Sequence, residues 1–92
     1  PNIIVGMVVD KYDRLIENAI IEIRDSRHHP VRAVKTNKLG QFFTVTPLPN
    51  DTYEVAAEKD GYNFAILSLQ LEGKIVDPME IRANNEGPAP FK

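Results

Sequence analysis

Residues 36–62, TNKLGQFFTVTPLPNDTYEVAAEKDGY, contain two predicted β-strands and the turns around them. Residues 41–46 are rich in aromatic and β-branched side chains, which favour strands. Residues 52–58 alternate between apolar and polar side chains, as a half-buried strand does. Pro47 and Pro49 cannot donate hydrogen bonds to a sheet, so we expect them to form a corner between these strands. We predict that the two strands pair with each other at the centre of the fold.

The rest of the chain repeats this pattern of short strands separated by turns. Clusters of Gly, Pro, Asn and Asp recur about every ten residues, which is typical of an all-β sandwich. The sequence therefore predicts an all-β fold, a seven-stranded Greek-key β-sandwich. Its other five strands are expected at residues 3–9, 19–24, 31–36, 63–71 and 79–83.

Two local features have more than one interpretation. Residues 15–19 (LIENA) could form a short helical turn or run extended. Gly6 lies inside an apolar strand, which indicates either a bulge or the close approach of another element. In residues 63–71, we expect the leucine face to point inward.

Length and composition limit the function classes. Ninety-two residues make one domain, which we place at residues 1–84, followed by a flexible tail or linker at residues 85–92. The net charge of −2 gives no basic surface for nucleic acid. No apolar run reaches the roughly 20 residues of a membrane helix, so we predict no membrane insertion by this segment. Because the chain starts with Pro1, we expect a processed or excised piece, with targeting signals able to lie outside it.

Several short motifs occur in a recognisable order. They are Gly6 and Val8, Asp10, Ala19 and Ile21, Thr36, Gly40 and Phe42, Leu48-Pro49, Tyr53, and Gly61-Tyr62. Over about residues 3–83, this order resembles the carboxypeptidase regulatory-like domain, a transthyretin-like (prealbumin-like) sandwich related to Cna-B-type domains. Asn18 and Asp51 stand where that family usually has Gly, and both residue types tolerate left-handed backbone.

The resemblance implies an accessory domain that stacks, spaces or folds beside a partner. It also favours a secreted, cell-surface or envelope protein of bacteria. The hydroxyisourate hydrolase branch of the fold needs a His near the N-terminal strand and a C-terminal Y-R-G-S, whereas here the first strand has no His and the chain ends in GPAPFK, so we predict no such activity. The isopeptide crosslink of Cna-B domains needs Lys and Glu where Met7 and Ala57 stand, so we predict no such bond.

Ionisable side chains suggest two metal hypotheses. His28 and His29 are adjacent near Asp25, and a pair in a turn could bind a metal ion. Several turn carboxylates could bind calcium, although no D-x-D-x-D-G sequence occurs. We expect solvated side chains in both cases, because turns favour such residues. The sequence predicts no catalytic set, no metal site and no cofactor.

Four residues are candidates for contact with a ligand or partner: Phe43, Tyr62, Ile3 and Val5. Strand parity and turn position favour exposure of Phe43 and Tyr62, whereas Phe42 and Tyr53 are expected in the core. The first hypothesis is a structural spacer or docking domain that contacts other protein domains, including a homodimer through an edge strand. The alternative is a carbohydrate- or peptide-binding domain that uses the exposed aromatic residues at its turns.

Overall fold

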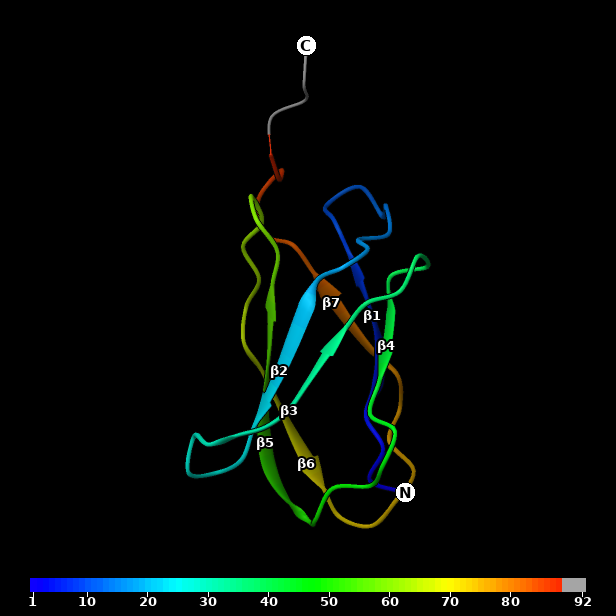
Figure 1. The fold of residues 1–92 in the computed structure, drawn as a ribbon, viewed down its shortest axis with the longest axis vertical. Coiled ribbons are helices and arrows are strands. Elements are labelled where there is room, and N and C mark those ends of the chain that lie inside the picture. The colour runs from blue at the N-terminus through cyan, green and yellow to red at the C-terminus, as the bar shows by residue number, and fades with distance from the viewer. Residues whose placement is uncertain (89–92) are drawn as a thin grey trace.

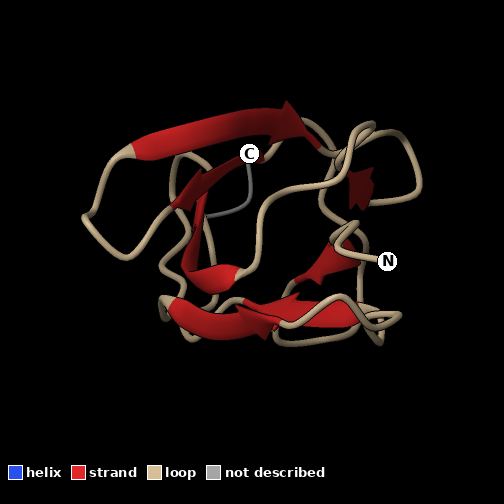
Figure 2. Cartoon of the chain, turned by 90° about the horizontal axis from the view of Figure 1, so that it is seen from below, coloured by secondary structure: helices blue, strands red, loops and turns tan. Residues whose placement is uncertain are grey.

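The computed structural model describes residues 1–88 and arranges them in two β-sheets (Figures 1 and 2). The strands are β1 (Val5–Val9), β2 (Ile20–Arg24), β3 (Pro30–Lys35), β4 (Gln41–Phe43), β5 (Asp51–Glu58), β6 (Leu67–Leu71) and β7 (Met79–Arg82). The smaller sheet has the order β4-β1-β7, and the larger has the order β3-β2-β5-β6. The predicted seven-stranded all-β sandwich is confirmed. Residues 1–88 include no helix long and apolar enough to cross a membrane.

Strand direction differs between the two sheets. In the larger sheet, every neighbouring pair is antiparallel, and β2 and β3 form a hairpin. In the smaller sheet, β1 is antiparallel to β4 but parallel to β7. The first and last strands of the sandwich are therefore direct neighbours.

The predicted pairing of residues 41–46 with residues 52–58 is wrong. β4 pairs with β1, whereas β5 lies between β2 and β6 in the other sheet. The connection between them crosses from one layer to the other and places Leu48 in the core, 3% exposed. Alternation shows which side chains point inward, but two strands that face each other across a core alternate just as paired strands do.

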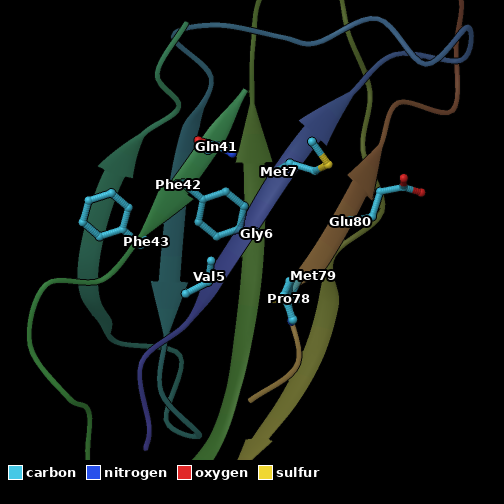
Figure 3. Close-up of a pocket in the computed structure, with 9 residues that line it drawn as sticks. All are labelled: Val5, Gly6, Met7, Gln41, Phe42, Phe43, Pro78, Met79 and Glu80. Atoms are coloured by element: carbon cyan, nitrogen blue, oxygen red, sulfur yellow. The ribbon is translucent and has the colours of Figure 1, made fainter. Parts of the chain in front are cut away.

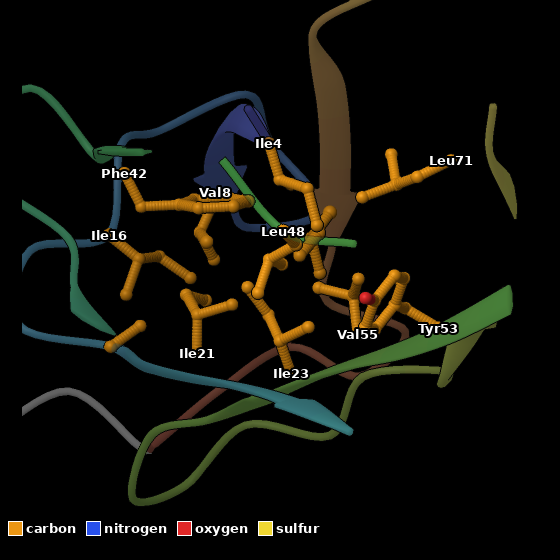
Figure 4. Packing of buried hydrophobic residues seen from close by; sticks show 12 residues of the cluster. Ile4, Val8, Ile16, Ile21, Ile23, Phe42, Leu48, Tyr53, Val55 and Leu71 are labelled. Carbon is orange, nitrogen blue, oxygen red and sulfur yellow. The ribbon is translucent and has the colours of Figure 1, made fainter. Parts of the chain in front are cut away.

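The core lies between the two sheets and is built from alternate residues of both (Figure 4). From the smaller sheet and its connections come Ile4, Val8, Phe42 and Ile81; from the larger come Ile21, Ile23, Tyr53, Val55 and Leu71. The core positions predicted for Phe42 and Tyr53 are confirmed, with exposed fractions of 1% and 2%. The leucine face of β6 also points inward, as predicted.

Gly6 is the point of close approach that the sequence indicated. A Cβ atom at this position would lie 2.6 Å from Phe42 Cζ and 2.7 Å from the carbonyl oxygen of Met79. Real Cβ atoms do not come so close to other heavy atoms, so only glycine allows the Phe42 ring and β7 to sit where they do.

Residues 15–19 form no helix, and they are not extended throughout, because Glu17 and Asn18 form a turn in which Asn18 has a positive φ. Leu15 forms an isolated bridge with Val9, and Ile16 is buried in the core. The buried hydroxyl of Thr36 holds this segment: it donates to the carbonyl of Ile16 (2.7 Å) and accepts from the N–H of Ala19 (2.9 Å).

Two residues, Asn18 and Asp51, stand where the family usually has Gly, and one of them has the left-handed backbone that Gly favours. Asn18 has a φ of 62° and so takes the left-handed conformation. Asp51 does not: it begins β5 in extended conformation, and its carboxylate accepts from the hydroxyl of Ser26 (3.0 Å). The expectation of left-handed backbone at Asp51 is therefore wrong, because the strand starts one residue earlier than the sequence suggested.

β4 and β6 are the strands that fall furthest short of their predicted lengths. β4 ends at Phe43, although Thr44 still exchanges hydrogen bonds with Ile4, and Val45 beyond it is 79% exposed. β6 begins only at Leu67, and before it Phe64 forms an isolated bridge with Ala83.

The chain after β7 lies against the turn between β5 and β6. Asn85 Oδ1 accepts from the N–H of Asn63 (2.8 Å), and its amide group donates to the carbonyl of Gly61 (3.0 Å). Gly87 passes over the ring of Tyr62. A domain boundary at residue 84 and a flexible tail over residues 85–92 stay a prediction, and residues 89–92 lie outside the described part of the chain.

Candidate interaction surfaces

The outer face of the three-stranded sheet carries an apolar hollow (Figure 3). Val5 and Phe43 lie directly opposite each other in the β1–β4 ladder, and they are 38% and 55% exposed. Met7, two residues along β1, is half-buried on the same side. The hollow has a volume of about 420 Å³, and its lining is completed by Gly6, Gln41, Phe42, Pro78, Met79 and Glu80.

Two of the four predicted contact residues are therefore brought together. Phe43 is exposed, as predicted, and it meets Val5 because β4 pairs with β1 rather than with β5. Ile3 is half-buried and lies outside the lining of the hollow. Met7 was not predicted as a contact residue, although it shares the Val5 face. Strand parity could not predict Pro78 as a contact residue, because Pro78 follows a loop whose path the sequence does not reveal.

Tyr62 belongs to a different surface. It is half-buried, stacks on Phe64 with ring centroids 6.1 Å apart, and packs against Gly87. A second, open hollow of about 750 Å³ lies beside it, and this hollow also includes Tyr12 and Arg14. Since Phe43 is not among its lining residues, Phe43 and Tyr62 do not form one aromatic platform.

Polar and aromatic groups meet in this second hollow. The hydroxyl of Tyr12 donates to the Glu86 carboxylate (2.8 Å), and this bond raises the pKa of Tyr12. The Arg14 guanidinium lies 5.2 Å from the centre of the Tyr12 ring, within cation–π range. Tyr12 and Glu86 are 74 positions apart in the chain, and neither gave a signal in the sequence.

Asp10 organises the turn that carries Tyr12. Its carboxylate accepts from the backbone N–H of Tyr12 (2.8 Å), the N–H of Arg14 (2.9 Å) and Arg14 Nε (2.7 Å). Burial by itself raises the pKa of Asp10, but these donors outweigh it and hold the pKa below its ordinary value. The expectation of a solvated turn carboxylate is wrong for Asp10, whose side chain is 4% exposed.

His28 and His29 lie at the tip of the β2–β3 hairpin. Their side chains are 75% and 70% exposed, as expected for a solvated turn. His28 Nδ1 lies 3.2 Å from a carboxylate oxygen of Glu54. The carboxylate of Asp25 accepts from the N–H of Arg27 and the N–H of His29, so it shapes the turn. Within residues 1–88, no group of three or more His, Asp or Glu side chains is placed to hold a metal ion.

The topology defines the class of protein: an all-β sandwich of the prealbumin-like type, with an apolar hollow on the three-stranded sheet. The family model of the carboxypeptidase regulatory-like domain matches residues 3–83, and the chain belongs to this family. The resemblance drawn from the short motifs is thereby confirmed. Domains of this family are non-catalytic. No curated protein matches the sequence.

Proposed function

We propose that this domain is a non-catalytic spacer and docking module of a larger bacterial protein at the cell surface or envelope. In this proposal, a neighbouring protein domain binds the outer face of the three-stranded sheet. The observation that carries it is the pairing of Val5 with Phe43, two exposed apolar side chains that face each other across one ladder. The proposed location at the cell surface or envelope is supported by the family membership alone.

The chemistry of the hollow supports a protein partner. Its lining is mainly apolar, with Gln41 and Glu80 as its polar members. Protein interfaces commonly have such a composition, with an apolar centre that includes aromatic and Met side chains inside a polar rim. An aromatic residue in such a centre often contributes much of the binding energy.

Hydrogen exchange in the full-length parent protein would test this proposal. We expect the amides of β1 and β4 to exchange more slowly there than in the isolated domain. A Val5→Glu/Phe43→Glu variant should abolish the difference and weaken binding to the neighbouring domain about 100-fold. A Leu39→Glu/Ile75→Glu variant adds the same charge at exposed positions outside the hollow and should behave as wild type. Equal exchange rates in both contexts would contradict the proposal.

The second hollow favours an alternative function, carbohydrate or peptide binding. Tyr12 and Tyr62 offer aromatic faces, while Arg14 and Glu86 offer a donor and an acceptor for hydroxyl groups. A glycan array with the wild-type domain tests this alternative, and Tyr12→Ala should remove any binding. Peptide ligands can be screened with the same pair of proteins. Binding that survives Tyr12→Ala would place the ligand elsewhere.

A further inference from the structure

Four strands lie at the edges of the two sheets, and three of them carry features that oppose pairing with another strand. β3 contains Pro30, Arg32 and Lys35. β4 is only three residues long. β7 is short and carries Glu80 and Arg82, whose side chains interact with each other. Prolines, charges and short length are the usual protection of edge strands.

β6 has none of these features. Its sequence is LSLQL, without charge or proline, and its pairing with β5 shows no bulge. β5 is its only paired neighbour in residues 1–88, so one row of backbone N–H and C=O groups faces outward. Leu67 and Leu69 are half-buried, whereas Leu71 is 1% exposed. The inner face of the sheet is thus incompletely covered along this edge.

The free edge has a defined length. At one end, Phe64 already bridges to Ala83 across to the other sheet. At the other end, Gly73 has a φ of 84°, which ends the extended conformation. A new strand can therefore pair along β6 and about one residue beyond it at each end.

The pattern of β6 is the same in both directions. About Leu69, the order of apolar and polar residues is symmetric. An antiparallel copy centred there would place Leu69 opposite Leu69, Leu67 opposite Leu71, and Ser68 opposite Gln70. Inward leucines then meet leucines, and outward polar residues meet polar residues. No like charges face each other within this ladder, because β6 carries none.

We propose that two copies of this chain associate through β6, antiparallel about a two-fold axis at Leu69. The two four-stranded sheets would become one continuous eight-stranded sheet. A second copy fits better than an unrelated strand because β6 is complementary to itself, as a two-fold interface requires. This inference does not depend on the proposed docking face, which lies on the other sheet.

The ladder is short, so the dimer should be weak. Five residues span about 17 Å, and the interface falls below the roughly 1,200 Å² typical of stable complexes. We expect a dissociation constant between about 10 μM and 1 mM, seen as concentration-dependent mass in sedimentation. A protein that stays monomeric at about 1 mM would overturn the proposal.

Charge placed on the outward face tests the interface without disturbing the core. Ser68→Glu/Gln70→Glu sets two pairs of like charges across the axis and should weaken association at least about tenfold. Ser68→Lys/Gln70→Lys should do the same, and mixing the two variants should restore dimers. Leu39→Glu/Val45→Glu adds equal charge at exposed positions off β6 and should dimerise as wild type does. If the Ser68/Gln70 variants dimerise as strongly as wild type, the proposal is overturned.

The absence of cysteine from the chain allows a test of register. Leu69→Cys should form an intermolecular disulfide on mild oxidation, because the two copies of residue 69 face each other within the distance that a disulfide spans. Leu67→Cys should react at least about tenfold more slowly, because its copies would lie four positions apart along the ladder, about 14 Å. Val45→Cys, remote from β6, should be equally slow. Equal rates for all three variants would overturn this register.

Discussion

At Gly6, even a methyl group has no room. The nearest atoms around a Cβ at this position belong to the Phe42 ring and to the backbone carbonyl of Met79, both within 2.7 Å. A ring can shift, but a carbonyl within a strand pair cannot move without separating β1 from β7.

Gly6→Ala should therefore destabilise the domain by about 3 kcal/mol, at the upper end of the cost of overpacking a core. Urea unfolding followed by far-UV circular dichroism measures this loss. Ser68→Ala, an exposed change in another strand, is the control and should stay within about 0.5 kcal/mol of wild type. A Gly6→Ala protein as stable as this control would show that β7 can move away from β1.

The Asp10 carboxylate makes stability depend on pH. Its pKa is lower in the folded protein than the ordinary value of 3.8, so folding favours the ionised form. This contribution is complete well above the unfolded pKa and is lost as the pH falls through the folded pKa. Asp10→Asn should be less stable than wild type at pH 7, and the difference should shrink from about pH 5 downward. Urea unfolding between pH 7 and pH 2 measures it, and a difference independent of pH would contradict this account.

Among single residues, the backbone conformation of turn residues was the easiest feature to predict. Gly40 and Asn18 have positive φ, as their residue types suggested, because left-handed backbone is a local property. The buried carboxylate of Asp10 was not predictable. Its burial depends in part on neighbours distant in sequence, such as Arg82, whose guanidinium donates to the Asp10 carbonyl (3.1 Å).

Among the elements, the segment between β1 and β2 depends most on a single side chain. Thr36 is 2% exposed, and its hydroxyl satisfies one buried donor and one buried acceptor, the Ala19 N–H and the Ile16 carbonyl. No helix or sheet ladder satisfies this pair of groups. The Thr36 hydroxyl thus provides the two hydrogen bonds that a helix or a sheet ladder would otherwise supply to Ile16 and Ala19.

Thr36→Val keeps the shape of the side chain but leaves both backbone groups without their partner. Each unsatisfied buried group costs about 1–3 kcal/mol, so we expect a loss of at least about 2 kcal/mol in the free energy of unfolding. Thr52→Val, the same change at an exposed position of β5, should cost no more than about 0.5 kcal/mol. Equal stability of the two variants would mean that water replaces the hydroxyl.

Sequence alternation identified the inward side chains of β4, β5 and β6 correctly, but it did not identify the neighbours of β4. Phe42 and Tyr53 were both expected to be buried, and both are. They reach the core from opposite sheets, however, because the connection containing Pro47 and Pro49 crosses between layers. Inward periodicity is identical for both arrangements, so only long-range packing distinguishes them. The convergence of Val5 and Phe43 depended on that same pairing.

For the whole molecule, the segment after β7 links parts of the chain that no local pattern connects. Asn85 binds the β5–β6 turn, and Glu86 binds Tyr12 in the turn after β1. The composition of residues 84–92 suggests a linker, because Pro, Gly and Asn are common in linkers. Asn, however, also forms side-chain-to-backbone bonds, as Asn85 does here.

Asn85→Ala should release this contact locally. The amide of Asn63 donates to Asn85, so its hydrogen exchange should accelerate about tenfold, while the amide of Val55 in the central strand should not change. Asn84→Ala is the matched control, because Asn84 uses its backbone N–H to bond the carbonyl of Asn63 and should retain protection. Unchanged exchange at Asn63 in the Asn85 variant would show that the backbone bond alone holds the turn.

The parallel pairing of β1 with β7 has a mechanical consequence for the proposed role as a spacer. Tension applied at Pro1 and Pro88 would draw these neighbouring strands along their length in opposite directions, so the bonds of that ladder would have to rupture together. Tension applied at Ile20 and Lys35 would instead open one hairpin bond by bond from its end. Single-molecule stretching should therefore record a several-fold higher rupture force in the first geometry. Similar forces in both would mean that the sandwich yields elsewhere before β1 and β7 part.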